Sequence, residues 1–213
     1  MPLEFVLKGL TRRTRVLVSL SSNLAATTSY EFTTRSLTDA ILSRPDIQVR
    51  SLRVAQSPQP VCEIRFPAAL DTESRTWRPR MCIKYSAAAE FSAAEGGADR
   101  DEVVLKNGGE LGLSWTADID GRRGVWGLSF CPFLLTLRSA VQRKVGEREE
   151  VVLAVFELRD WWGRGLSMDL GGLCIMDEVV GERGVRDVVC TLVGVLVYWE
   201  RAGKMAYIGQ DAL

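Results

Sequence analysis

The segment 185–202 reads VRDVVCTLVGVLVYWERA and is the most apolar part of the 213-residue chain. Between Val188 and Trp199 only Thr191 and Gly194 are not hydrophobic. A transmembrane helix needs about 20 apolar residues. This run has 12, with charged residues directly on both sides. We therefore expect a buried core element and no membrane span.

The same run has no polar face, so a helix formed by it must be enclosed by protein on every side. Valine is frequent in it, and β-branched residues also suit a buried strand. The run is longer than a usual strand. The sequence therefore predicts a central helix over about residues 185–202, with a buried strand as the alternative.

Short segments before this run alternate between apolar and polar residues, as half-buried strands do. Gly, Pro and Asp separate them, and their spacing of roughly 8–15 residues is typical of an antiparallel barrel or sandwich. The predicted fold is mainly β, with about a dozen strands. The segments are 4–10, 14–21, 29–33, 48–54, 61–66, 81–85, 102–106, 110–118, 124–130, 133–137, 151–159, 166–170 and 173–178.

Turn residues predict several connections between these strands. Asp120-Gly121 is a strong hairpin signal, and both Asn107-Gly108-Gly109 and Gly171-Gly172 are expected to be turns. Polar or Ala- and Ser-rich composition predicts loops at 70–79 and 86–100, and a short helix is possible at 37–42. No long linker interrupts the chain, so we expect a single domain over residues 1–213.

The composition excludes several classes of function. The 27 basic and 27 acidic residues cancel, whereas nucleic-acid binding needs a surplus of positive charge. Histidine, the commonest general base and metal ligand, is absent, so we expect no enzyme, metal site or cofactor. The five cysteines form no CxxC pair and fit a reducing compartment. Without a signal peptide, the expectation is a cytoplasmic monomer.

A series of strands followed by one uniformly apolar C-terminal helix resembles the tubby C-terminal-like superfamily, which includes the LURP-one-related and phospholipid scramblase proteins. The likeness is greatest over residues 102–202, and it is to small fungal members of unknown function. The corresponding segments are 111–115, 125–130, 151–158, 166–170 and 188–199. The family's phrase of a small residue, a charge and a Trp is only loosely present around Trp115 and Trp126. The resemblance implies a closed antiparallel barrel of about 12 strands around one buried helix.

The resemblance also implies a non-enzymatic binding or adaptor domain, peripheral to a membrane, for phosphoinositide or another anionic lipid headgroup, or for a protein partner. No basic residue of the family can be aligned with this chain. The local candidates for headgroup binding are Arg122 and Arg123 in the predicted hairpin turn and Arg138, Arg143 and Lys144 in the next connection. The acids at 147, 149 and 150 would offset part of their charge.

Two alternatives remain open. The phrase Asp118-Ile119-Asp120-Gly121 resembles the nucleophile motif of haloacid-dehalogenase-like phosphatases, in which the first Asp attacks phosphate and the second acts as acid and base. An ordinary hairpin turn is the competing interpretation, and Arg122 stands where that family usually has Thr or Val. The other alternative is a barrel that carries a small apolar ligand, with Trp161-Trp162 covering a barrel mouth.

Overall fold

The computed structural model describes residues 2–11, 13–20, 28–35, 45–52, 58–71, 76–86, 102–108, 114–130, 133–144, 147–159, 169–179 and 181–201. Within these ranges the chain is mainly β, with 13 strands in one antiparallel sheet followed by the helix α2 (Gly181–Arg201). The strands are β1 (Leu3–Gly9), β2 (Thr14–Ser19), β3 (Ser29–Thr34), β4 (Ile47–Leu52), β5 (Gln59–Arg65), β6 (Ala68–Asp71), β7 (Thr76–Tyr85), β8 (Glu102–Gly108), β9 (Ser114–Ile119), β10 (Arg122–Phe130), β11 (Phe133–Lys144), β12 (Glu147–Leu158) and β13 (Asp169–Ile175).

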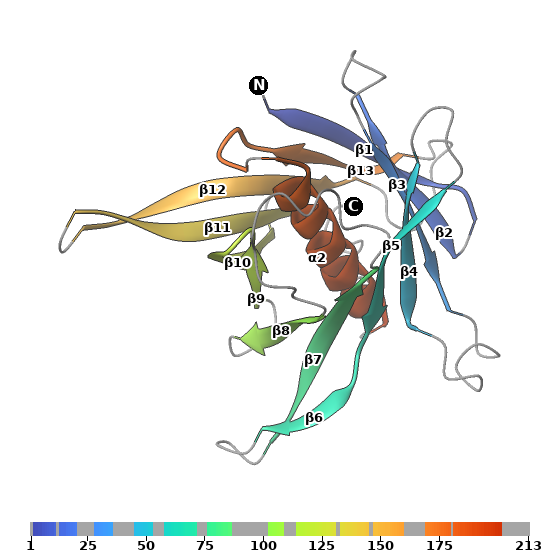
Figure 1. Ribbon diagram of the computed structural model, residues 1–213, viewed down its shortest axis with the longest axis horizontal. Helices are drawn as coiled ribbons and strands as arrows, with labels where there is room; N and C mark the ends of the chain where they lie inside the picture. The colour runs from blue at the N-terminus through green and yellow to red at the C-terminus, as the bar shows by residue number, and fades with distance from the viewer. Residues whose placement is uncertain are drawn as a thin grey trace.

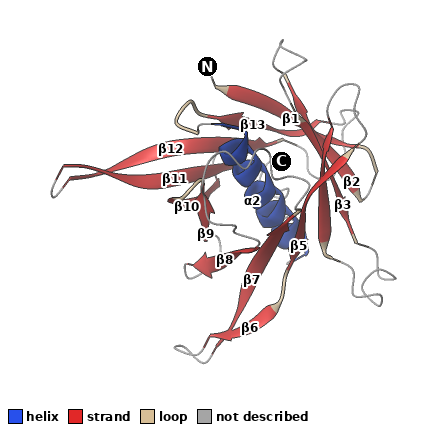
Figure 2. Ribbon diagram, in the orientation of Figure 1, coloured by secondary structure: helices blue, strands red, loops and turns tan. Residues whose placement is uncertain are grey.

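Most strands pair with their neighbours in sequence, and two pairings join strands that are not consecutive. The first strand, β1, lies between β2 and β13. Strand β5 pairs with β4 on one side and with β7 on the other, while β6 pairs with β7 alone in the described part of the chain. The sheet curves around α2 (Figure 1), so that strands lie on several sides of the helix (Figure 2).

Alternation along the strands builds the core, because successive side chains of a strand point to opposite faces. In β9 the buried positions are Trp115, Ala117 and Ile119, with half-buried residues between them. In β1 the buried positions are Phe5 and Leu7, and the residue between them is half-buried. The inward residues of the sheet and those of α2 form one hydrophobic cluster.

The apolar segment forms the predicted helix. It extends four residues further toward the N-terminus than predicted and its 21 residues span about 31 Å. Every residue from 187 to 197 is buried, which covers three turns and therefore all sides of the helix. Glu182 in the first turn and Arg201 in the last complement the helix dipole. No helix among the described residues is long and apolar enough to cross a membrane.

The predicted hairpin at Asp120-Gly121 is confirmed. Ile119 of β9 pairs with Arg122 of β10, so the loop has two residues. Asp120 has φ 49° and Gly121 φ 79°, and two successive positive φ angles are those of a type I′ turn. At the other end of β9, Asn107 and Gly108 lie in β8 and are not part of a turn. The connection follows them in residues that the structure does not describe.

The predicted turn at Gly171-Gly172 is wrong. One strand, β13, runs through both glycines, and neither has a positive φ. A Cβ on Gly171 would lie 2.4 Å from the carbonyl oxygen of Glu157 and 2.6 Å from Cζ of Phe156. Gly171 is therefore explained by the close approach of β12 to β13, which leaves no room for a side chain. The strands predicted at 166–170 and 173–178 are one element where the structure describes them.

Two predicted connections are also strands. The polar segment 70–79 contributes to the β6–β7 hairpin, and the charged segment after Leu137 extends β11 and β12. Pairing satisfies the backbone of these residues whatever their polarity, and it sets Lys144 opposite Glu147. The predicted short helix at 37–42, residues 87–100 of the loop predicted at 86–100, and the Trp161-Trp162 pair lie outside the described residues.

Candidate functional site

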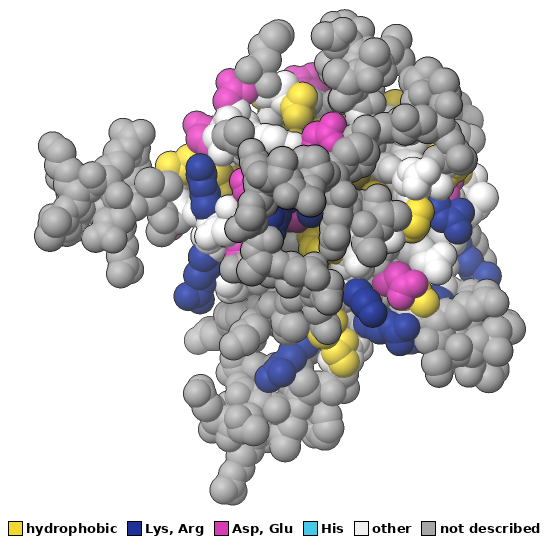
Figure 3. Space-filling model, viewed as in Figure 1, with side chains coloured by type: hydrophobic (Ala, Val, Ile, Leu, Met, Phe, Trp, Pro, Cys, Tyr) yellow, Lys and Arg dark blue, Asp and Glu magenta, His cyan; other side chains and the backbone are white. Residues whose placement is uncertain are grey.

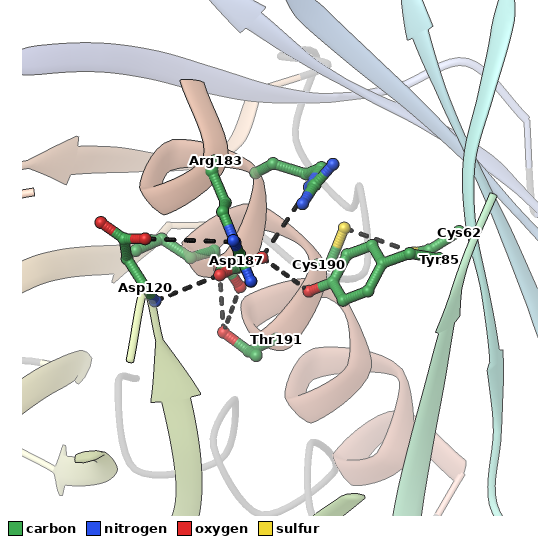
Figure 4. A network of polar contacts seen from close by, with 9 residues as sticks. Cys62, Tyr85, Asp120, Arg183, Asp187, Cys190 and Thr191 are labelled. Atoms are coloured by element: carbon green, nitrogen blue, oxygen red, sulfur yellow. Dashed lines mark hydrogen bonds and ion pairs between the residues drawn. The ribbon is translucent and has the colours of Figure 1, made fainter. Parts of the chain in front are cut away.

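A cluster of polar side chains surrounds the first turns of α2, where Asp187 is its central acceptor (Figure 4). Asp187 is 6% exposed. Its Oδ1 accepts a hydrogen bond of 2.8 Å from the hydroxyl of Tyr85, and its Oδ2 accepts one of 3.2 Å from the backbone N–H of Asp120. One carboxylate thus connects α2 to β7 and to the β9–β10 turn. We call these three residues, with Arg186 and the two cysteines described next, the N-terminal cluster.

Cys62 of β5 and Cys190 of α2 lie in the same cluster with their sulfur atoms 3.3 Å apart. Both are free and buried. Cys62 is also the direct cross-strand neighbour of Tyr85, and Cys190 follows Asp187 by three residues on the same side of the helix. Two contacts between the sheet and the helix therefore lie side by side. One joins the thiols of Cys62 and Cys190, and the other joins the Tyr85 hydroxyl to the Asp187 carboxylate.

Thr191 extends the network toward the core. Its hydroxyl lies 2.8 Å from the carbonyl oxygen of Asp187, to which it donates, and it accepts a 3.0 Å hydrogen bond from Nε1 of Trp126. The polar residue in the middle of the apolar run is thus fully bonded, and it satisfies a buried indole N–H that would otherwise cost free energy.

Burial controls the ionisation of this cluster. It raises the pKa of the Asp187 carboxyl, against the hydrogen bonds from Tyr85 and Asp120 and the positive charges of Arg186 and Arg183. Burial also raises the pKa of the Tyr85 hydroxyl. Burial raises the pKa of the Cys62 thiol as well, and the hydrogen bond to Cys190 raises it further.

The cluster positions the helix and has the character of a structural network. A nucleophile is activated by a lowered pKa or an adjacent base, and the shifts of Cys62 and Tyr85 run in the opposite direction. Among the described residues, no three Cys, Asp or Glu side chains form a group that could hold a metal ion. Arg186 covers the Tyr85 ring, with its guanidinium carbon 4.6 Å from the ring centroid.

Ion pairs connect the other end of α2 to the sheet. Arg201 forms an ion pair with Asp46. The Asp46 carboxylate forms a second ion pair with Arg35, whose Nε lies 2.9 Å from Oδ1. Arg15 of β2, which is 5% exposed, pairs with Glu200 at 2.8 Å. Both ends of the helix are therefore held to the sheet by charged or strongly polar contacts, while its middle packs on apolar side chains.

The structure places the five basic residues predicted to bind a headgroup on two neighbouring strands, β10 and β11. Arg138 pairs with Val125, so Arg123 is its diagonal neighbour. Arg122 and Arg123 begin β10 directly after the turn, and Nη1 of Arg122 donates to the carbonyl oxygen of Glu178 at 3.3 Å. The predicted connection that would hold the others is strand, as described above. Arg143 and Lys144 end β11, five and six residues beyond Arg138, which is about 17–20 Å along a strand.

Nearby acids also offset the charge of this group. Arg138 lies 3.4 Å from Glu150, and Asp118 is the cross-strand neighbour of Arg123. Glu150 and Asp118 therefore offset part of the positive charge of these residues.

A different basic surface lies on the outer face of β5 and β7. Arg65 is opposite Cys82 in the pairing of these strands, so Arg80 and Lys84 are its diagonal neighbours, about 7–8 Å away. All three side chains are exposed, and we call them the basic patch. Dark-blue side chains gather over the part of the surface where Figure 1 draws β4, β5 and β7 (Figure 3).

The basic patch keeps a net positive charge. On β5 and β7 the described charged side chains are these three cations and Glu63, which gives +3 − 1 = +2. Glu63 lies 3.9 Å from Arg65, and both side chains are about half exposed, so water screens the pair. Alternation in the predicted strands 61–66 and 81–85 is the signal that could have placed Arg65 and Lys84 on an outward face. The pairing of two strands separated by β6 has no signal in the sequence.

The residues of the two alternative hypotheses are also located. Asp118 is half-buried on β9 and Asp120 is exposed in the turn, 4.0 Å from Nε of Arg183. A small apolar hollow lies between α2 and β10–β12. It is lined by Leu128, Phe133, Leu135, Phe156, Leu158, Leu196 and Trp199. These side chains are apolar apart from the indole N–H of Trp199.

Comparisons with known proteins return no relative. No protein-family model matches the chain, no curated protein matches its sequence, and no solved structure matches its fold. The site must therefore be interpreted from its own geometry.

Proposed function

We propose that this chain is a non-enzymatic binding domain that recognises anionic lipid headgroups at a membrane surface through its basic patch. The observation that carries the proposal is the diagonal arrangement of Arg65, Arg80 and Lys84 on adjacent strands, with Glu63 as the one described acid on the same two strands. Arginine binds phosphate with two parallel hydrogen bonds, and lysine adds a point charge.

The attraction can be estimated from the charges. Each Lys or Arg close to an anionic leaflet contributes about 1 kcal/mol, so three contribute about 3 kcal/mol. That corresponds to roughly a 150-fold change in partition between water and the membrane. The strands hold the three cations on one face of the sheet, so little backbone has to be ordered on binding.

We also propose that the sheet closes into a barrel around α2, as in the tubby C-terminal-like superfamily. The double pairing of β5, with β4 and with β7, supports closure because it leaves no unpaired edge between them. The burial of α2 on all sides supports it as well. The absence of a matching family model means that this likeness rests on architecture alone.

Vesicle sedimentation tests the lipid proposal. The protein should sediment at physiological salt with phosphatidylcholine vesicles that contain phosphatidylserine or a phosphoinositide, and remain in solution with phosphatidylcholine alone. The triple variant Arg65→Glu, Arg80→Glu, Lys84→Glu should lose at least about 100-fold in partition. Higher salt should weaken wild-type binding because it screens exposed charges.

A matched control separates the basic patch from net charge. The triple variant Arg122→Glu, Arg123→Glu, Arg138→Glu changes the charge of the protein by the same amount and should keep most of its binding. Equal loss in both triple variants, or no wild-type binding to anionic vesicles, would contradict the proposal. Magnesium-dependent hydrolysis of a generic phosphate ester that Asp118→Asn abolishes would contradict its non-enzymatic part.

A further inference from the structure

The two buried cysteines of the N-terminal cluster have a chemistry that lipid binding does not use. Cys62 and Cys190 are 128 residues apart in the chain, yet their sulfur atoms are in contact at 3.3 Å. The Cys62 thiol donates a hydrogen bond to the sulfur of Cys190. One cysteine belongs to β5 and the other to α2, so a covalent bond between them would join the helix to the sheet that surrounds it.

We propose that Cys62 and Cys190 are a covalent modification site, at which hydrogen peroxide converts the two thiols into a disulfide between β5 and α2. A disulfide needs a sulfur–sulfur separation of about 2.05 Å. The sulfur atoms therefore have to approach by little more than 1 Å, which a rotation about the side-chain χ1 angles can supply without moving the backbone far.

The reaction balances with one peroxide for each pair of thiols. The first sulfur, as thiolate, attacks the peroxide; an S–O bond forms, the O–O bond breaks, and the released hydroxide takes up the thiol proton as water. The second sulfur then attacks the sulfenic acid; the S–S bond forms, the S–O bond breaks, and hydroxide again leaves with a proton as water. Two electrons pass from the sulfurs to the peroxide oxygens.

The surroundings favour the intramolecular product over further oxidation. Cys62 is 3% and Cys190 0% exposed, so a sulfenic acid formed on either sulfur meets the other thiol before it meets a second peroxide. The same burial makes the first step slow, because peroxide reaches the pair only when the end of the sheet near Tyr85 and Arg186 opens locally. Low concentrations of urea should therefore accelerate disulfide formation.

The disulfide would be independent of the basic patch. Cys62 and Arg65 are on opposite faces of β5, one toward the helix and the other toward solvent. Its effect falls on stability, because a bond that closes a loop of more than 100 residues restricts the unfolded chain strongly. For a protein of this length we expect the midpoint of thermal unfolding, Tm, to rise by roughly 10 °C or more.

The experiment uses a background variant with Cys82, Cys131 and Cys174 changed to Ser, which leaves only the pair. After hydrogen peroxide treatment in dilute urea and removal of the urea, titration in denaturant should find no free thiol. Intact mass should fall by two hydrogen atoms, peptide mapping should find the segments around residues 62 and 190 linked, and Tm should rise. The control Cys190→Ala in the same background should keep its one thiol free of any intramolecular link and show no rise in Tm.

Three results would overturn the proposal: both thiols still titrate, the sulfurs gain oxygen without a link, or the link joins two copies of the chain. If the background variant does not fold, native wild-type protein is first alkylated with iodoacetamide to block its accessible cysteines, and the buried pair is then oxidised and mapped in the same way. No lipid is present in either experiment, so its outcome is separate from that of vesicle sedimentation.

Discussion

Replacing Gly171 by alanine should force β12 and β13 apart. The new Cβ would lie 2.4 Å from the carbonyl oxygen of Glu157, which is backbone and cannot rotate away, and 2.6 Å from the ring of Phe156. Inserting a methyl group into a packed interior typically costs about 1–3 kcal/mol. A clash with backbone belongs at the upper end of that range. Restricting the unfolded chain returns about 0.4–1 kcal/mol, so the net loss in the free energy of unfolding is about 2–3 kcal/mol.

The neighbouring glycine is a matched control. A Cβ on Gly172 would meet Nη2 of Arg159 at 3.4 Å, an ordinary contact with the end of a flexible side chain. Gly172→Ala should therefore be neutral or slightly stabilising. Urea unfolding followed by tryptophan fluorescence measures both variants, and the Tm of Gly171→Ala should fall by roughly 5–10 °C. Losses within about 0.5 kcal/mol of each other would refute the argument that the two strands approach too closely for a side chain at residue 171.

Two further substitutions examine the packing of α2. Asp187→Asn should cost about 1–3 kcal/mol, because an amide cannot accept from both the Tyr85 hydroxyl and the Asp120 N–H. The difference in the free energy of unfolding between wild type and this variant should narrow as the pH rises above the ordinary carboxyl pKa of about 4. As the pH rises, the unfolded Asp187 carboxyl loses its proton before the folded one, whose pKa is raised by burial. Only the wild type therefore loses stability through this group. A difference in the free energy of unfolding in urea that stays constant or widens would refute this. Gly194→Ala would place its Cβ 2.2 Å from Sδ of the buried Met81, so it should destabilise by about 1–3 kcal/mol despite the higher helix propensity of alanine. Met81→Val should relieve part of that loss in a double-mutant cycle, and simple additivity would count against the contact.

Local patterns in the sequence predicted most of the elements, because they report what each segment buries. Alternation located the strands, and the length of the apolar run distinguished a helix from a strand at 188–199. The phrase Asp120-Gly121 predicted its turn, since few residues adopt positive φ easily. The same reasoning failed at Gly171, where glycine serves close approach and not a turn, and along β11 and β12, where charged residues pair in an extended hairpin.

The site was less predictable, because it depends on which distant strands meet. Arg65 and Arg80 become neighbours only through the pairing of β5 with β7. Cys62 meets Cys190 only once the helix lies inside the sheet. Clustering along the chain instead pointed to the basic residues of 122–144, of which Arg143 and Lys144 lie at the far end of β11.

The position of α2 after all the described strands has a consequence for how the chain folds during synthesis. Leu3 pairs with Ile175, so one edge of β1 stays unpaired during synthesis until β13 emerges, after every other described strand, although β2 can pair with the other edge early. The residues that fill the space inside the sheet are made later still. Until then the inward-facing side chains of the sheet have no helix to cover them, and the nascent chain exposes apolar surface of the kind that chaperones bind. Pairing at such long range also makes folding slow, so the final docking of α2 is expected to be the step that commits the chain to its native state.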